Sequence, residues 1–306
     1  MAASRPVPLT LLLSLVFFSA CAVVERLGVN VLAKRAVLPD AQVQRNVSYG
    51  VGRALDVYRA TTPNAPVLVF VYGGGWNTGS KDLRVGGLDV YGNIGRFYAS
   101  QGVTTVVINY RLQPAVRWRE QAADVAAAVK WTKQNIATFG GNPERIFLMG
   151  HSAGAHLASM VSLNQGIQTT AGIGRCDIDG VVSVSGAGLD LNDQETYRTE
   201  DPGYYEQRFG PRTDRAEWTA ASPATHADAA DAAVLILYAT GESRGLQRQS
   251  RVFKAALDRA SVAAQLLAIK GESHTRMVLV LSHPEKAAVP AVLDFLRNTR
   301  CPRQPL

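Results

Sequence analysis

Short runs of apolar residues recur along the chain, separated by longer segments in which apolar positions return at helical spacing. An uninterrupted apolar run of this kind is typical of a strand whose two faces are both covered. A continuous run of this kind predicts a strand at 67–72, the segment 103–108 repeats the pattern, and further buried strands are predicted at 145–149, 180–185, 233–238 and 264–269. Segment 55–58 alternates between apolar and polar residues instead, which predicts a strand buried on one face only.

Helices are predicted between these strands. The longest is an amphipathic helix over 118–139, which the glycine- and proline-rich segment 140–143 ends. Further helices are expected after Ser152, near 247–259 and near 284–298. Strands that alternate with helices indicate an α/β fold, in which helices cover both faces of a mostly parallel sheet.

Segment 186–231 interrupts this alternation and is rich in charged residues, tyrosine and proline. We interpret it as a small lid-like insertion over the carboxyl edge of the sheet, where open α/β folds bind ligands. Its large aromatic side chains either line a substrate entrance or pack the insertion onto the sheet. They are Tyr197, Tyr204, Tyr205, Phe209 and Trp218.

Residues 1–20 are predicted to be an export signal. Arg5 precedes an apolar stretch at 9–18, and small residues precede Cys21. This stretch is shorter than the roughly 20 apolar residues that a membrane span needs. The four residues from Phe18 to Cys21 also resemble a bacterial lipobox. That resemblance predicts a lipidated Cys21 that anchors the chain in the cell envelope; periplasmic or secreted soluble protein and an uncleaved anchor are the alternatives.

The chain is therefore expected to consist of a lipoprotein-type signal (1–20), a linker (21–42) and one α/β domain (43–300). With Cys21 acylated, the remaining cysteines are Cys176 and Cys301. They could pair in an oxidising compartment, but their spacing does not decide it.

Composition narrows the class of protein without revealing its chemistry. The 306 residues are 47% hydrophobic, an ordinary share that excludes disordered, collagen-like and multi-span membrane proteins. The 32 Lys and Arg residues against 25 Asp and Glu give a net charge of +7. Because the basic residues are scattered, no nucleic-acid partner is expected, and the charge favours at most a weak attraction to anionic surfaces.

The strongest chemical signal is the sequence Gly150-His151-Ser152-Ala153-Gly154. It follows a predicted strand and precedes a predicted helix, which is the context that a nucleophile elbow requires. In such a turn the serine hydroxyl projects from the sheet edge, and the glycines remove side chains that would clash. Ser152 is therefore the candidate nucleophile, and the alternative is a glycine-lined turn with a capping serine.

A second glycine-rich segment, Tyr72-Gly73-Gly74-Gly75-Trp76, follows another predicted strand. Glycines allow backbone N–H groups to approach and face a developing negative charge. The alternative is that these glycines only build a tight turn.

With these two segments the chain resembles the α/β-hydrolase superfamily and, within it, the HGGG-type carboxylesterases. It looks like the bacterial esterases of the BD-FAE type, with prenylcysteine methylesterases and kynurenine formamidases nearby. The other shared motifs are Asn-Tyr-Arg-Leu at 109–112, Asn-Ile at 135–136, Gly-Gly-Asn-Pro at 140–143 and the continuation of the elbow to 157. The resemblance runs from about residue 47 to 296, and it implies a twisted sheet of about eight strands.

The resemblance also implies that the backbone N–H groups of Gly74, Gly75 and Ala153 form an oxyanion hole. The chain departs from the pattern at Tyr72, where these families usually have His. That histidine normally organises the loop, so the change affects substrate fit more than catalysis.

His274 is the candidate general base. This fold orders its catalytic residues as serine, acid and histidine along the chain, so the histidine is expected after the last strand. His274 lies in the loop that follows the predicted strand 264–269. Packing, polar or capping contacts are expected of the other histidines, which are His151, His156, His226 and His283.

Glu242 is the candidate acid. It follows the predicted strand 233–238 and lies seven residues before Gln249 and eight before Ser250, a register that matches the relatives. A glutamate accepts the imidazole N–H as an aspartate does. The other candidates are Asp190, Asp193 and Asp231.

These residues predict a serine carboxylesterase that hydrolyses small to medium acyl esters through an acyl-enzyme intermediate. The same triad also suits amide hydrolysis of the arylformamidase type, and an inactive hydrolase-fold binding protein is a further alternative. No metal or cofactor is expected, because the chain lacks an H-E-x-x-H motif, a Cys/His cluster and a P-loop. The expected partner is a small ester, and the sequence indicates no oligomeric state.

Overall fold

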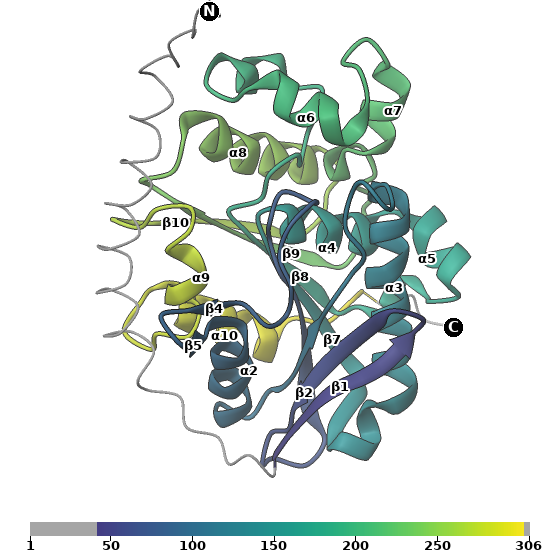
Figure 1. The fold of residues 1–306 in the computed structure, drawn as a ribbon, viewed down its shortest axis with the longest axis vertical. Coiled ribbons are helices and arrows are strands. Elements are labelled where there is room, and N and C mark those ends of the chain that lie inside the picture. The colour runs from purple at the N-terminus through teal and green to yellow at the C-terminus, as the bar shows by residue number, and fades with distance from the viewer. Residues whose placement is uncertain (1–41, 303–306) are drawn as a thin grey trace, which may run out of the picture.

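A twisted, mostly parallel sheet of eight strands forms the centre of the computed structural model, which describes residues 42–302 (Figure 1). The strand order is β1-β2-β6-β3-β7-β8-β9-β10, in which the first three strands pair antiparallel and all later neighbours pair parallel. The strands are β1 (Val43–Gly50), β2 (Arg53–Tyr58), β3 (Ala65–Val71), β6 (Thr104–Ile108), β7 (Gly141–His151), β8 (Gly180–Val184), β9 (Ala233–Ala239) and β10 (Ala264–Ile269). A separate hairpin consists of β4 (Arg84–Val85) and β5 (Leu88–Asp89).

Helices cover both faces of this sheet (Figure 1). One face carries α2 (Val90–Ser100) and α10 (Ala288–Asn298), and the short α9 (Met277–Val280) lies beside α2. The other face carries α3 (Trp118–Asn135), α4 (Ala153–Leu163) and α8 (Arg244–Arg259), with α5 (Gln165–Ala171) packed outside α3 and α4. The predicted α/β class with a mostly parallel sheet is therefore confirmed.

All six segments predicted as buried strands form strands. Those in the middle of the sheet are covered on both faces, whereas β10 lies at the sheet edge and is only partly buried, so the prediction of a fully buried strand is wrong for 264–269. The predicted helix 118–139 is α3 followed by a 3₁₀ turn at Ile136–Phe139. Helix α8 begins three residues earlier than expected and α10 four residues later. Strand β1, helix α2 and the small helices α5, α6 and α7 have no counterpart in the sequence prediction, whereas β2 contains the predicted strand 55–58.

The prediction that segment 55–58 is buried on one face only is wrong. Asp56 is buried as completely as its apolar neighbours, because α2 covers the face that Asp56 shares with Tyr58. Its carboxylate is held by Lys81, at 2.9 Å between Nζ and Oδ1, and by Arg45, at 2.9 Å between Nη1 and Oδ2. A buried charge is tolerated only when it is paired in this way.

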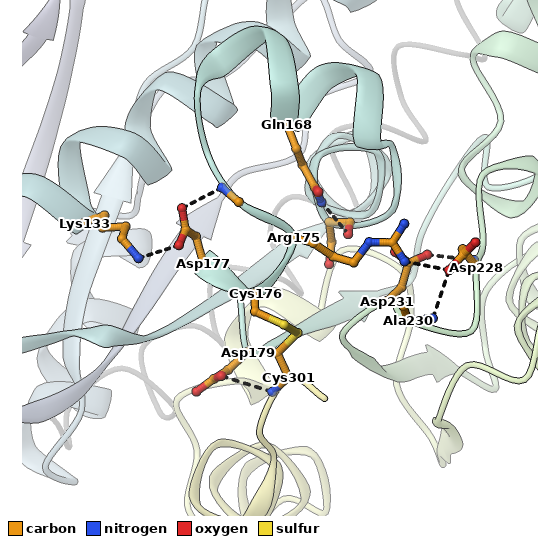
Figure 2. The surroundings of a disulfide bond; sticks show 12 residues. Lys133, Gln168, Arg175, Cys176, Asp177, Asp179, Asp228, Ala230, Asp231 and Cys301 are labelled. Atoms are coloured by element: carbon orange, nitrogen blue, oxygen red, sulfur yellow. Dashed lines mark hydrogen bonds and ion pairs between the residues drawn. A yellow bond between two sulfur atoms is a disulfide. The ribbon is translucent and has the colours of Figure 1, made fainter. Parts of the chain in front are cut away.

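A disulfide joins Cys176 to Cys301 across a sequence separation of 125 residues (Figure 2). Cys176 lies in the 3₁₀ turn η4 (Arg175–Asp177), just before β8, and Cys301 follows α10. The backbone N–H of Cys301 also donates to Asp179 Oδ1 at 3.1 Å. The structure therefore contains the pairing that the sequence left open, and it fastens the end of the described chain to the sheet.

The segment between β8 and β9 contains four short helical pieces above the sheet. They are η5 (Gln194–Arg198), α6 (Pro202–Phe209), α7 (Arg215–Ala220) and η6 (Pro223–Thr225). The predicted signal, most of the predicted linker and Cys21 lie outside the described residues. Within residues 42–302, no helix has both the length and the apolar character to cross a membrane.

Candidate active site

Ser152 lies at the tip of a sharp turn between β7 and α4, and its backbone is in a left-handed conformation with φ 55° and ψ −120°. The two flanking glycines are needed because the chain crosses itself closely here. A Cβ on Gly150 would lie 2.1 Å from the carbonyl oxygen of Gly154, and a Cβ on Gly154 would lie 2.1 Å from the carbonyl oxygen of Val71. The elbow predicted from the sequence is therefore present, and its strain fixes the serine at the sheet edge.

The structure brings Ser152, His274 and Glu242 together at the carboxyl edge of the sheet. Ser152 Oγ lies 2.9 Å from His274 Nε2, and His274 Nδ1 lies 3.1 Å from Glu242 Oε2. With the imidazole proton on Nδ1, the histidine donates to the carboxylate and accepts from the serine hydroxyl. This is the hydrogen-bond order of a Ser-His-acid triad, built from the ends of β7, β9 and β10.

Glu242 is buried, and its carboxylate contacts the imidazole of His274. Its carboxyl group has no solvent exposure. Oε2 binds His274, whereas Oε1 has no hydrogen-bond partner in the described part of the chain. Because water does not reach this carboxylate, its charge acts strongly on the adjacent imidazole of His274, whose side chain is partly exposed.

The three other candidate acids are occupied elsewhere. Asp190 Oδ1 accepts from the backbone N–H of Asn192. Asp193 forms a two-point ion pair with Arg248 at 2.6 and 2.7 Å. Asp231 accepts from the N–H of Asp228, and burial raises its pKa to about 6.

The loop after β3 presents consecutive glycines beside Ser152. Gly73, Gly74 and Gly75 line the same cavity as the serine. Gly74 has φ 132°, and a Cβ there would lie 2.1 Å from the carbonyl oxygen of Thr78. The Gly74 carbonyl accepts from Thr78 N at 3.0 Å, so it points back into the loop. Ala153 is buried and begins α4, where backbone N–H groups lack intrahelical acceptors.

Tyr72, the departure from the family pattern, is buried and does not line the cavity. Its ring stacks on Tyr110 with 4.5 Å between centroids, and its carbonyl oxygen accepts from the Tyr110 hydroxyl at 3.0 Å. A Cβ on Gly79 would lie 2.8 Å from the Tyr72 ring, so the loop folds back over it. Tyr72 therefore packs against the glycine loop, residues 73–75, without lining the cavity.

His156 connects the glycine loop to the insertion. Trp76 Nε1–H donates to His156 Nδ1 at 3.2 Å, which places the imidazole proton on Nε2, and Nε2 lies 2.7 Å from the carbonyl oxygen of Ala221. Burial lowers the pKa of His156 to about 4, so the ring is neutral. The sequence predicted packing or polar contacts here, and this one is a bridge between three segments.

His151 is the neighbour of both Ser152 and His274. Its Nε2 lies 2.9 Å from the carbonyl oxygen of His274, and its ring centroid is 4.9 Å from that of His274. Burial, followed by the charge of His274, lowers the pKa of His151 to about 3. It therefore stays neutral beside the imidazolium that catalysis would create at His274.

The remaining two histidines lie away from the triad. His226 Nε2 contacts the carbonyl oxygen of Ala220 at 2.9 Å. His283 is buried near α9, and its backbone N–H donates to the carbonyl oxygen of Val280 at 3.2 Å. The capping role expected of His283 at the start of a helix is wrong, because α10 begins only at Ala288.

The cavity in front of Ser152 has a volume of about 620 Å³. One wall is apolar and comes from the β4–β5 region, α2 and α9, which the sequence prediction did not assign to the site. Its members are Leu83, Val85, Val90, Val278 and Leu279. The sequence indicates this wall only weakly, because each of these elements contributes only one or two apolar residues, next to a turn or in a short helix.

The aromatic residues of the insertion divide between the two expected roles. Tyr204 lines the cavity. Tyr205, Phe209 and Trp218 are buried in the packing of the insertion, and Tyr197 donates its hydroxyl proton to the carbonyl oxygen of Leu191 at 2.8 Å. Of these five aromatic residues, only Tyr204 therefore contacts the space that a substrate would occupy.

No group of three or more His, Cys, Asp or Glu side chains that could hold a metal ion occurs within residues 42–302. A charged residue that lines the cavity is Arg276, whose Nε pairs with Glu272 Oε2 at 3.0 Å.

The strand order, the elbow and the residues at the carboxyl edge define an α/β-hydrolase. A family model described as BD-FAE matches residues 55–257, and the chain belongs to this family.

Curated relatives include a probable isoprenylcysteine alpha-carbonyl methylesterase of Oryza sativa subsp. japonica, 39% identical over 132 residues, which are 42% of this chain and 29% of that protein. Esterase LipQ of Mycobacterium tuberculosis is 29% identical over 264 residues, 82% of this chain and 61% of that protein. The chain thus spans less than two thirds of the length of either relative.

Solved structures agree on the fold. A truncated carbohydrate esterase from gut microbiota superposes with a TM-score of 0.70 at 20% identity, covering 86% of this chain and 98% of that chain. An esterase of Pyrobaculum calidifontis has a TM-score of 0.69 at 20% identity, covering 91% of each chain.

Proposed function

We propose that this protein is a serine carboxylesterase that hydrolyses small to medium acyl esters through Ser152, His274 and Glu242. The observation that carries the proposal is the unbroken hydrogen-bond order from Ser152 Oγ through His274 to Glu242, at 2.9 and 3.1 Å. Relatives named as esterases support the reaction type. The cavity of about 620 Å³ with one apolar wall supports the size of the acyl group.

The reaction begins when His274 Nε2 takes the proton of Ser152 as Oγ attacks the ester carbonyl. Glu242 keeps the imidazole proton on Nδ1 and stabilises the imidazolium. The backbone N–H groups of Gly74, Gly75 and Ala153 stabilise the tetrahedral oxyanion, and removing one such donor typically costs roughly 3 kcal/mol of barrier. His274 then gives its proton to the leaving alcohol, and it activates a water that releases the acid from Ser152.

The test is turnover of p-nitrophenyl acetate and p-nitrophenyl butyrate by the purified protein and by Ser152→Ala. We expect the variant to lose activity by at least about 10³-fold while its melting temperature stays unchanged or rises. The matched control is Ser48→Ala, the same substitution at an exposed serine in β1. Equal background rates in wild type and Ser152→Ala would refute the proposal, and a strong preference for N-formyl amides would assign the triad to amide hydrolysis.

We also propose that the protein is exported and tethered to a membrane through a lipid on Cys21. The lipobox-like sequence before Cys21 supports this. The Cys176–Cys301 disulfide also supports it, because such bonds persist mainly in oxidising compartments outside the cytosol. Cys21→Ser should move the protein from the membrane fraction to the soluble fraction and abolish incorporation of labelled palmitate. A variant that stays in the membrane fraction refutes the tether.

A further inference from the structure

Tyr204 is the one side chain of the insertion that reaches the catalytic cavity. It lies on α6 and lines the cavity together with Gly75, Ser152 and His274. A Cβ on Gly75 would lie 2.4 Å from Tyr204 Oη, so the hydroxyl occupies the place that a side chain at position 75 would take. The hydroxyl therefore lies directly against the loop that holds the proposed oxyanion donors.

Arg208 fixes Tyr204 in this position. The guanidinium lies over the Tyr204 ring, with 3.9 Å from Cζ to the ring centroid, and Nη1 donates to the Tyr204 carbonyl oxygen at 2.9 Å. Arg208 Nε also donates to the carbonyl oxygen of Gly75 at 3.2 Å. The same side chain thus binds the tyrosine and the glycine loop, and Gln113 Nε2 donates to the Arg208 carbonyl oxygen at 3.2 Å.

The hydroxyl of Tyr204 is a donor whose proton is not used within the protein. The hydroxyl has a side-chain hydrogen bond with Arg208, but the guanidinium can only donate, so this contact does not use the tyrosine proton, and no acceptor for it is found among residues 42–302. The hydroxyl of Tyr197, in contrast, donates to the carbonyl oxygen of Leu191. Burial raises the pKa of Tyr204, so the hydroxyl keeps its proton at neutral pH although the charge of Arg208 opposes this shift. A pre-positioned neutral donor facing a reacting carbonyl strengthens its hydrogen bond as negative charge develops.

We propose that Tyr204 is a further catalytic residue, whose hydroxyl donates a hydrogen bond to the substrate carbonyl oxygen in the transition state beside the backbone donors of the glycine loop. This assignment rests on the proposed esterase function. The tyrosine keeps its proton throughout, so no bond to it forms or breaks. Arg208 is a positioning residue, which acts by holding the ring and the Gly75 carbonyl.

The test compares Tyr204→Phe with wild type, because phenylalanine keeps the ring under Arg208 and removes only the hydroxyl. With p-nitrophenyl butyrate we expect kcat to fall by about 10- to 100-fold and KM to change by less than about twofold. The inhibition constant of an aryl trifluoromethyl ketone, which forms an oxyanion on the serine, should rise by the same factor. The matched control is Tyr197→Phe, which should leave kcat and this inhibition constant unchanged.

An active wild type with unchanged kcat and unchanged inhibition constant in Tyr204→Phe overturns the assignment but leaves the esterase proposal standing. A rise in KM alone also overturns it, because the hydroxyl would then contact the ground state and the transition state equally. If Tyr204→Phe lowers the melting temperature and leaves kcat unchanged, Tyr204 has a structural role and not a catalytic one. If wild type and Ser152→Ala show the same background rate, the esterase proposal itself fails, and this outcome does not depend on Tyr204.

Discussion

Substitutions at Glu242 test two properties of the proposed third triad residue separately, namely its charge and the length of its side chain. Glu242→Gln keeps the length of the side chain and removes the charge, whereas Glu242→Asp keeps the charge and shortens the side chain by one methylene. In wild type Glu242 Oε2 lies 3.1 Å from His274 Nδ1 in a fully buried position. The two variants therefore test two different parts of the same contact.

The expected losses follow from this geometry. In the aspartate variant the carboxylate retracts by roughly one carbon–carbon bond, to about 4.6 Å from Nδ1, which is beyond hydrogen-bond reach. At an effective dielectric constant of about 20, this retraction weakens the attraction to the imidazolium by about 2 kcal/mol, or roughly 20-fold in rate. In the glutamine variant the counter-charge is absent, and an amide NH₂ turned toward Nδ1 moves the imidazole proton to Nε2. We expect a loss of about 10³- to 10⁴-fold in kcat.

The assay is kcat for p-nitrophenyl butyrate, with the concentration of competent serine titrated by a fluorophosphonate. The control is Asp231→Asn, the same change of carboxylate to amide at an alternative candidate acid that lies outside the cavity. The reasoning predicts the order wild type, then Glu242→Asp, then Glu242→Gln, with the control equal to wild type. If Glu242→Gln kept more activity than Glu242→Asp, or if Asp231→Asn lost activity instead, Glu242 would not be the residue that stabilises the imidazolium.

Two predictions concern stability. Cys301→Ser should lower the free energy of unfolding by about 4–5 kcal/mol, because the bond to Cys176 closes a loop with a sequence separation of 125, and the melting temperature should fall by about 10 °C. The kcat should not change, since neither cysteine lines the cavity. Urea unfolding with and without dithiothreitol measures the loss of stability, and a free energy of unfolding that reduction leaves unchanged would contradict the prediction. Stability should also fall between pH 7 and pH 5. In the folded protein His151 and His156 are neutral, because burial lowers their pKa values to about 3 and about 4. In the unfolded chain both have a pKa near 6.5, so below this pH the unfolded state binds protons that the folded state does not. The free energy of unfolding therefore falls as the pH falls below 6.5, by about 2 kcal/mol for each histidine at pH 5. Asp231, with a pKa raised to about 6, opposes this by about 1 kcal/mol, because its protonation relieves the folded state. Urea midpoints that stay constant or rise on acidification would refute this account, and Asp231→Asn should make the fall steeper.

The parts of the fold that could be predicted are those whose cause is local. The central strands are mostly apolar because both of their faces are covered, and this leaves a direct pattern in the sequence. The elbow is predictable for a similar reason. Gly150 and Gly154 occur where any Cβ would strike the backbone, so the spacing of these glycines reports the turn itself. His274 and Glu242 followed from the positions of strands rather than from any motif of their own.

The parts that could not be predicted depend on partners far along the chain. Asp56 gives β2 the pattern of a half-exposed strand, but Lys81 neutralises it after the chain has folded. The apolar wall of the cavity is assembled from single residues such as Val90 and Leu279, which lie on separate elements. Nothing local in the insertion distinguishes Tyr204, which faces the cavity, from its buried neighbour Tyr205. That difference is fixed by the contact between α6 and the glycine loop.

The same contact changes the role that we expect of the insertion. A lid that opens would have to separate His156 from Ala221 and Arg208 from Gly75, which are joined at 2.7 and 3.2 Å. It would also expose Phe209 and Trp218, which are completely buried now, at a cost on the order of 5 kcal/mol. Because these contacts end on Gly75 and, through His156, on Trp76, opening would also release the loop that holds the proposed oxyanion donors. We therefore expect the insertion to stay closed during turnover, to support the glycine loop, and to select substrates through the shape of the cavity around Tyr204.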